Sequence, residues 1–303
     1  NNYYACVYGA AGVYGLCFCD VSTDAFSATQ VSGADAMQDV QNELGSFLPS
    51  EALLGGTAAE DETLADLLRE RFHTCVNLGK DAQFDPALCE AAVTAQFGKS
   101  TQELGLAELP CVTLAAGALL MTLRDLQKND LPHIRELELY VAGKFMQLDL
   151  AARRNLELTE TMRGKEKRGS LLWVLDKTKT AMGGRLLRAW MERPLLSPAQ
   201  ITRRLTAVEE LVKKTIDREE LLLSLREITD FERAMTRIMT GTASCRDLAA
   251  LAQGASTLPE IKQRLSGMRA PYLQSIHEQL DTLADLKAQI DRTIVDDPPF
   301  LLR

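Results

Sequence analysis

The sequence predicts an α/β domain followed by an all-α domain, and three observations support this division. The first third of the chain alternates strand-like apolar runs with helical patterns, whereas the last half has apolar residues at every third or fourth position. Residues 1–117 contain 4 Lys and Arg against 16 Asp and Glu, and residues 118–303 contain 30 against 26. A length of 303 residues is also typical of two domains. We therefore expect a boundary between residues 117 and 118.

The first domain is expected to contain a mixed sheet with helices on its faces. Residues 3–33 have the pattern of two or three strands, separated by turns that contain Gly or Ser, Thr and Asp. A helical pattern follows at 34–47, an apolar strand at 51–56, an amphipathic helix at 61–72 and a strand at 74–79. This β-β-β-α-β-α-β order resembles the ribonuclease H type of fold.

A ribonuclease H-like fold raises the alternative of a metal-dependent nuclease. Two-metal catalysis needs three or four convergent carboxylates that hold ions about 4 Å apart. Asp20 and Asp24 are the candidates, but both lie in a turn, where Asp is common because it makes local hydrogen bonds. No later strand has a carboxylate inside its apolar run. We favour a structural role for this pair and keep the nuclease as an alternative.

Residues 97–101, Phe-Gly-Lys-Ser-Thr, resemble the end of a phosphate-binding loop. The complete loop needs a Gly where this chain has Val93, and it follows a strand, whereas this segment follows a helical pattern at 85–97. Gly98 is better explained as the residue that ends this helix. We therefore expect no ATP site and no enzymatic activity in this chain.

The chain has seven cysteines, an odd number without a Cys-x-x-Cys pair, which favours reduced thiols over a disulfide framework or a zinc site. The longest apolar run, 111–123, is shorter than the roughly 20 residues of a membrane span and predicts a buried helix. The sequence starts without the pattern of a secretory signal. We expect a cytoplasmic location and no membrane contact.

The second half is expected to be helical after a short strand-like segment at 136–149. Pro198, Pro259 and Pro271 lie at or near expected helix starts, where the missing N–H costs least. The helix-like runs are 171–178, 183–192, 198–214, 218–241, 244–265 and 275–294.

Three stretches, 148–164, 169–211 and 230–251, closely resemble the core domain of the MutS family of bacterial DNA mismatch-repair proteins. The resemblance covers nearly the whole chain and implies that residues 1–117 correspond to the family's ribonuclease H-like connector domain. Residues 118–303 would then be a helical core domain that is truncated before the lever arms and the clamp. The family's Phe-x-Glu mismatch-reading motif and Walker A loop do not occur here.

The resemblance implies a non-catalytic region that couples binding of mismatched DNA to an ATP-driven conformational change and recruits the repair factor MutL. Mismatched double-stranded DNA, MutL and a second MutS subunit would be partners of the full-length protein, and ATP and magnesium its cofactors. A MutS-related protein of recombination or ribosome rescue remains an alternative, although the connector domain favours mismatch repair. The acidic surface of residues 1–117 is the candidate MutL surface. The acidic helix at 60–72 is one element of it, and a solvated helix face is the simpler interpretation of that helix.

Residues 167–195 are rich in Lys and Arg and include only two acidic residues, Asp176 and Glu192. They either contact DNA phosphates or form a structural joint in which Arg side chains pair with carboxylates of neighbouring helices or of the acidic connector domain. We favour the joint, because Trp173 and Trp190 are expected in the core rather than available for stacking on bases. Thr180 is expected to cap a helix, and the Gly183–Gly184 pair to permit a close approach of a helix or loop. The candidate nucleic-acid contacts are Arg153, Arg154, Lys165, Lys167 and Arg168.

Overall fold

The computed structural model of the chain describes residues 3–23, 25–128, 130–141, 145–146, 148–295 and 298. The chain divides into two compact units, 1–156 and 157–303. The expected boundary at 117/118 falls instead inside helix α4 (Pro110–Gln127). Because α4 packs on the sheet and strand β6 (Glu138–Leu139) pairs within it, the first unit extends well beyond the change in charge.

The first unit contains a six-stranded mixed sheet in the order β5-β4-β1-β2-β3-β6. Strands β1, β2 and β3 are antiparallel neighbours, whereas β4 is parallel to β1, β5 to β4 and β6 to β3. The β1–β2 hairpin turns at Ala11 and Gly12, both with positive φ, which matches the twist of the strands it joins. The remaining strands are β1 (Tyr3–Ala10), β2 (Val13–Asp20), β3 (Phe26–Ser32), β4 (Glu51–Gly56) and β5 (Cys75–Leu78).

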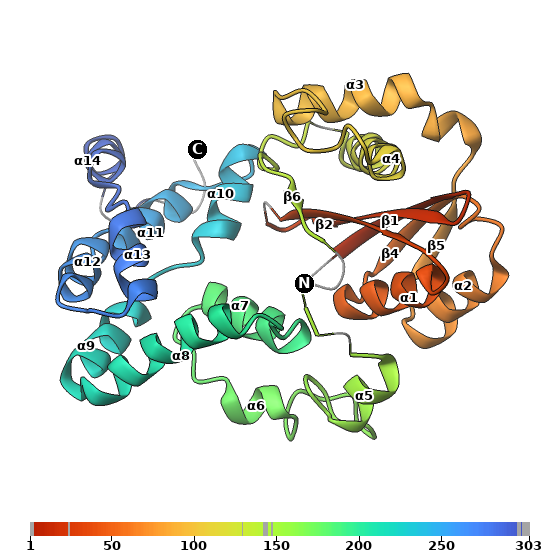
Figure 1. Cartoon of the computed structure of the whole chain (residues 1–303). Helices are drawn as coiled ribbons and strands as arrows, with labels where there is room; N and C mark the ends of the chain where they lie inside the picture. Colours follow the sequence, from red (N-terminus) through yellow and green to blue (C-terminus); the bar gives the residue numbers. More distant parts are fainter. Residues whose placement is uncertain are drawn as a thin grey trace. The chain divides into compact units, whose positions relative to one another are not determined.

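Helices cover both faces of this sheet, as the sequence predicts (Figure 1). Side chains of β1 alternate between the two layers: Cys6 joins the core under α3 and α4, and Val7 joins the core under α1 and α2. The helices of this unit are α1 (Ala36–Phe47), α2 (Glu62–Asp66), α3 (Pro86–Phe97), α4 and α5 (Leu150–Asn155), with a π-helical turn at Leu67–Arg71 and a 3₁₀ turn at Asp81–Phe84.

Helix α4 contains the apolar run 111–123, and its buried residues confirm the expected buried helix. Its backbone lies directly against its neighbours: a Cβ added at Gly15 of β2 would be 2.2 Å from the carbonyl carbon of Cys111. A Cβ added at Gly117 would be 2.4 Å from the Cα of Cys89 in α3. Among the described residues, no helix is both long and apolar enough to cross a membrane.

The amphipathic segment expected at 61–72 is α2 followed by the π-helical turn. Asp61 caps it by accepting a hydrogen bond from the Leu64 N–H at 3.1 Å. Leu64 and Leu68 are fully buried, and the carboxylates of Glu62 and Glu70 are exposed. The segment therefore buries its apolar side and presents acidic groups to solvent.

The second unit is helical, and three of the expected helix-like runs are divided in two. The run 218–241 breaks where Asp230 caps α10, and the run 244–265 breaks before Pro259 at the start of α12. The run 275–294 breaks at Leu283, which has a φ of +52°. The helices are α6 (Leu171–Leu175), α7 (Ala181–Glu192), α8 (Pro198–Lys213), α9 (Thr215–Arg226), α10 (Phe231–Met239), α11 (Cys245–Ala255), α12 (Leu258–Ser266), α13 (Pro271–Gln279) and α14 (Ala284–Thr293).

Among the described residues of the second unit, two separate hydrophobic clusters form its core. The first cluster lies between α8, α9, α12 and α13 and includes Ala207, Leu221, Ile261 and Leu273. The second lies between α10, α11 and α14 and is centred on Leu251 and Ile290. Pro198, Pro259 and Pro271 occupy the first turns of α8, α12 and α13, which confirms their expected positions.

Candidate functional site

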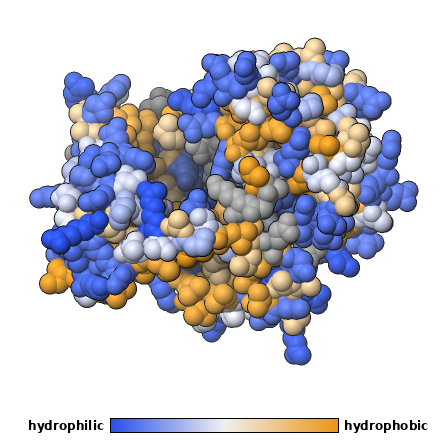
Figure 2. All heavy atoms as spheres, viewed as in Figure 1, coloured by the Kyte–Doolittle hydropathy of each residue, from blue (hydrophilic) through white to orange (hydrophobic). Residues whose placement is uncertain are grey.

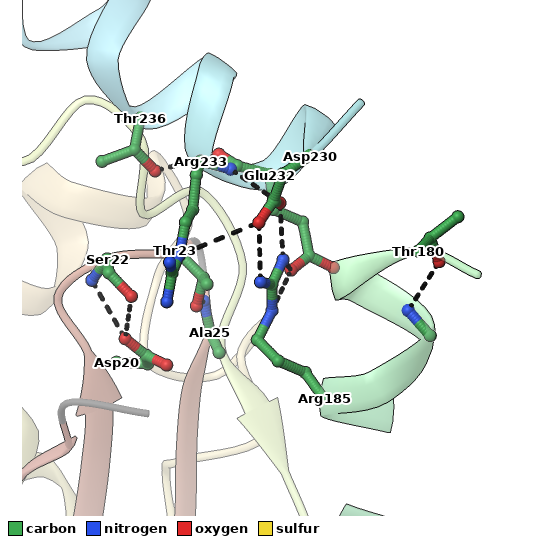
Figure 3. A network of polar contacts seen from close by, with 11 residues as sticks. Asp20, Ser22, Thr23, Ala25, Thr180, Arg185, Asp230, Glu232, Arg233 and Thr236 are labelled. Carbon is green, nitrogen blue, oxygen red and sulfur yellow. Dashed lines mark hydrogen bonds and ion pairs between the residues drawn. The ribbon is translucent and has the colours of Figure 1, made fainter. Parts of the chain in front are cut away.

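The basic segment, residues 167–195, makes its most extensive ionic contact through Arg185 of α7. The two terminal nitrogens of Arg185 donate to the two carboxylate oxygens of Asp230, at 2.8 and 2.6 Å. Its Nε donates to Oε2 of Glu232 at 3.0 Å. Figure 3 shows this arrangement, in which the guanidinium of α7 faces the carboxylates at the N-terminus of α10. The expected pairing of a basic side chain with carboxylates of a neighbouring helix is confirmed here.

Electrostatics at this contact favours the charged form of both partners. The hydrogen bond from Arg185 is the main cause that lowers the pKa of Asp230, and burial opposes it. The hydrogen bond to Asp230 likewise raises the pKa of Arg185. Asp230 has a second role, because its Oδ1 also accepts from the backbone N–H of Arg233 at 3.4 Å and caps α10. One carboxylate thus starts α10 and binds α7.

The start of α7 has the local structure that its sequence predicts. Oγ1 of Thr180 accepts a hydrogen bond from the Gly183 N–H at 2.9 Å, which confirms the expected cap. A Cβ added at Gly183 would lie 2.9 Å from that hydroxyl, and one added at Gly184 would lie 3.4 Å from Oγ1 of Thr178. The Gly pair therefore accommodates the loop that precedes its own helix.

The two tryptophans differ from the expectation that both lie in the core. Trp173 is 48% exposed, because α6 has only five residues and buries Leu172 instead. Trp190 is partly exposed, and the guanidinium of Arg204 in α8 lies 3.5 Å from its ring centroid. Trp190 therefore serves as a contact between α7 and α8.

The five candidate nucleic-acid residues are divided between the two units. Arg153 and Arg154 belong to the first unit. The guanidinium of Arg153 donates to the Leu148 carbonyl at 2.9 Å and to the Ser46 hydroxyl at 2.7 Å, whereas Arg154 is exposed. Arg153 therefore has a structural contact inside the first unit.

The other three candidates, Lys165, Lys167 and Arg168, lie in an exposed loop of the second unit. Nζ of Lys167 contacts Oδ2 of Asp176 at 2.6 Å. The hydrogen bond from Lys167, followed by one from Thr178, lowers the pKa of Asp176 to about 2. The carboxylate thus neutralises part of the positive charge of this loop.

An apolar surface in the second unit was not expected from the sequence. Four residues of α8, Ile201, Leu205, Val208 and Val212, are exposed by 37% to 60% and follow the spacing i, i+4, i+7, i+11 along one side of the helix. Figure 2 shows apolar side chains at the molecular surface, and further exposed ones occur in α6 and α7. The helical period of α8 was visible in the sequence, but not which part of its apolar face would be buried.

Of the two residues of the nuclease alternative, Asp20 has local hydrogen-bond partners. Asp20 ends β2, is 2% exposed, and accepts hydrogen bonds from the Ser22 N–H at 3.0 Å and the Ser22 hydroxyl at 2.7 Å. Asp24 lies outside the described residues. Within the described part of the chain, no three Asp, Glu, His or Cys side chains gather as metal ligands would. Gly98 ends α3 with a φ of +63°, which confirms its expected role in the Phe-Gly-Lys-Ser-Thr segment.

Comparison with known proteins assigns both units to one family. The family model for MutS domain II matches residues 2–135, and the model for MutS domain III matches residues 151–303. The chain is 40% identical over 303 residues to the DNA mismatch repair protein MutS of Ruminiclostridium cellulolyticum, an alignment that covers 100% of this chain and 34% of that protein. It is 38% identical over 303 residues to the protein of the same name from Acetivibrio thermocellus, covering 100% and 35%. For that of Symbiobacterium thermophilum the identity is 40% over 304 residues, covering 100% and 34%.

The chain thus spans about a third of the length of these relatives. The two family models match it in consecutive order and leave only residues 136–150 between them, which include β6 and the connection from β6 to α5. The chain therefore belongs to the MutS family and carries its domains II and III.

Proposed function

We propose that the chain is the connector and core region of a mismatch-repair protein, and that it has no catalytic activity of its own. The consecutive matches to MutS domains II and III are the observation that carries this proposal. The names of the relatives favour mismatch repair over the alternatives of recombination and ribosome rescue. In the whole protein, the region would couple binding of mismatched DNA to a conformational change driven by ATP and magnesium. The whole protein would act as a homodimer.

The first unit, in this proposal, is a ribonuclease H-like connector without nuclease chemistry. Its three antiparallel strands, with two further parallel strands added beside β1, support the assignment of the fold. Against catalysis, the Asp20 carboxylate is already hydrogen-bonded to Ser22 and is nearly inaccessible to solvent.

The second unit transmits the conformational change in this proposal. Direct contact with DNA phosphates is a secondary role of the chain, shared by residues of both units. Arg154 of the first unit and Arg168 of the second are exposed and can approach a phosphate, and Lys165 is exposed as well. Lys167 would first exchange its contact with Asp176, and Arg153 its contact with Ser46. Such contacts carry no base information, because phosphates are the same in every sequence. We therefore assign these five residues a sequence-independent, salt-sensitive contribution.

The acidic surface of the first unit is the proposed docking site for MutL. Its candidate element is the segment from α2 through the π-helical turn, which fixes Leu64 and Leu68 in the core while Glu62, Asp66 and Glu70 stay exposed. A surface of this kind steers a basic partner toward it and loses that effect as salt screens the charges.

A binding experiment with MutL from the same organism tests this proposal. The 303-residue chain and its Glu62→Gln/Glu70→Gln variant are compared by biolayer interferometry at 50 mM and 300 mM NaCl. We expect binding that weakens with salt and falls about threefold in the variant, since exposed charges contribute modestly. A matched control, Glu227→Gln/Glu278→Gln, removes the same charge from exposed positions of the second unit. Equal loss in both variants would contradict the assignment to this surface, and absence of binding at 50 mM would contradict MutL recruitment.

A further inference from the structure

Helix α7 contacts both groups of helices that form the second unit. The hydrophobic cluster of α8, α9, α12 and α13 and that of α10, α11 and α14 are separate. The chain crosses from one group to the other in the short connections α9–α10, α11–α12 and α13–α14. Backbone connections of this kind tether two helix groups but leave their relative orientation to the side chains between them.

Two residues of α7 are among those side chains. Arg185 binds Asp230 and Glu232 at the start of α10, in the second group. Trp190 stacks with Arg204 of α8, in the first group. The two residues are five positions apart, which is about 140° around a helix with 3.6 residues per turn. Helix α7 therefore contacts the two groups with different sides.

These contacts are polar in character, although α7 carries several apolar residues. No residue of α7 is buried, whereas the helices of both clusters each bury at least one side chain. The side chain of Arg185 is only 17% exposed, so its four hydrogen bonds to Asp230 and Glu232 are partly shielded from water. Ionic contacts weaken with added salt, whereas apolar burial does not.

We propose that α7, through its ionic contact with α10, sets the orientation of the α10–α11–α14 group relative to the α8–α9–α12–α13 group. Loss of the Arg185 contact then releases α10 while both hydrophobic clusters stay folded. The second unit thereby has two discrete internal arrangements, with α7 engaged or released. This inference rests on contacts within residues 157–303 and does not depend on the proposed role in mismatch repair.

The test compares Arg185→Gln with Arg188→Gln in the 303-residue chain. Arg188 lies on the same helix but pairs with Glu192 of α7 itself, at 2.9 Å, so its removal controls for a lost charge. Spin labels at Gln200 of α8 and Ala250 of α11, both exposed, report the distance between the two groups by pulsed electron paramagnetic resonance. Cys75 and Cys245 are replaced by Ser to confine labelling to these sites.

We expect Arg185→Gln to broaden the distance distribution and to speed amide exchange in α10 about tenfold, the effect of losing hydrogen bonds between charged groups. Arg188→Gln should leave the distance distribution and the exchange rate unchanged, and 1 M NaCl should broaden the distance distribution of the unsubstituted chain. Arg185→Lys keeps the charge without the paired geometry and should give an intermediate result. An Arg185→Gln distribution that matches Arg188→Gln would overturn the proposal. If Arg185→Gln fails to fold, an unchanged distribution of the parent chain in 1 M NaCl would overturn it equally.

Discussion

A single methyl group added to a helical glycine should have opposite effects in the two units. Gly117 in α4 and Gly184 in α7 both lie within helices, and replacing either with Ala gains roughly 1 kcal/mol of helix propensity. The new Cβ at 117 would lie 2.4 Å from the Cα of Cys89, whereas the one at 184 would have its nearest neighbour at 3.4 Å. The same substitution therefore separates intrinsic propensity from packing.

The magnitude at Gly117 follows from the shortfall in distance. Carbon atoms pack at about 3.5–4.0 Å, so α3 and α4 must separate by more than about 1 Å to admit the methyl group. The obstacle is backbone of α3, which cannot move away as the end of a side chain can. Overpacking of this kind costs about 1–3 kcal/mol or more. Because the contact is with backbone, we take the upper end of this range, about 3 kcal/mol, and subtract the gain in propensity of about 1 kcal/mol. Gly117→Ala should therefore lower the free energy of unfolding by about 2 kcal/mol, and Gly184→Ala should raise it by up to about 1 kcal/mol.

Urea denaturation followed by two signals assigns each effect to its unit. Both tryptophans, Trp173 and Trp190, lie in the second unit, so their fluorescence reports on that unit, whereas far-UV circular dichroism reports on both. Gly117→Ala should lower the midpoint seen by circular dichroism, and Gly184→Ala should keep or raise the midpoint seen by fluorescence. A Gly117→Ala chain as stable as its parent, or a Gly184→Ala chain less stable than it, would refute the reasoning from Cβ distances.

Three further outcomes can be measured on the same chain. In a thiol titration with a disulfide reagent, exposed Cys75 should react first and half-buried Cys245 more slowly. The other five cysteines should react only after unfolding, because burial excludes the reagent and raises the pKa of their thiols. Fast reaction of more than two thiols would contradict this. The five are Cys6, Cys17, Cys19, Cys89 and Cys111. The pKa of Asp176 is lowered from 3.8 to about 2, so its contact with Lys167 stabilises the fold above pH 3.8. This contribution is lost as the pH falls from 3.8 to about 2, and amide exchange of α6 should accelerate over that range. Asp176→Asn should remove this dependence of the exchange rate on pH. DNA binding should be weak, decrease with salt and be equal for a G·T duplex and its matched control, since phosphate contacts read no sequence; a several-fold preference for the mismatch would exclude this interpretation.

Most elements of the first unit were predictable because their signals are local. The apolar run 111–123 became buried α4, and Gly98 ended α3 as a left-handed residue. The boundary at 117/118 was not predictable from charge, since α4 belongs to the sheet through contacts of its backbone with Gly15 and with α3. Charged residues lie mainly on surfaces that face solvent. A helix buried against a sheet carries few of them, so a change in charge composition does not locate its domain.

In the second unit, the sequence pattern located the helices but did not predict where they end or which side chains are buried. The period of apolar residues found its helices but missed the breaks, because the same period continues through the cap at Asp230 and the turn at Leu283. The interpretation of Trp173 as a core residue failed for a related reason: a tryptophan is buried only if its helix packs on that side, and α6 packs through Leu172. The burial of Trp173 depends on contacts between residues that are distant in the sequence, which a local pattern does not contain.

The basic segment illustrates how far such contacts alter the meaning of a charge pattern. As a sequence, residues 167–195 have the composition of a surface that binds anions. In the folded unit, Arg185 is paired with carboxylates 45 and 47 residues away, Arg188 with Glu192, and Lys167 with Asp176. Arg185 can stabilise the start of α10 because Asp230 is both its acceptor and the cap of that helix, so one substitution at 185 changes an ion pair and the environment of a helix terminus together. An excess of Lys and Arg in such a helical unit therefore identifies candidates for two roles, binding of phosphates and ion pairing between helices. The carboxylates within reach of each side chain decide which role it has.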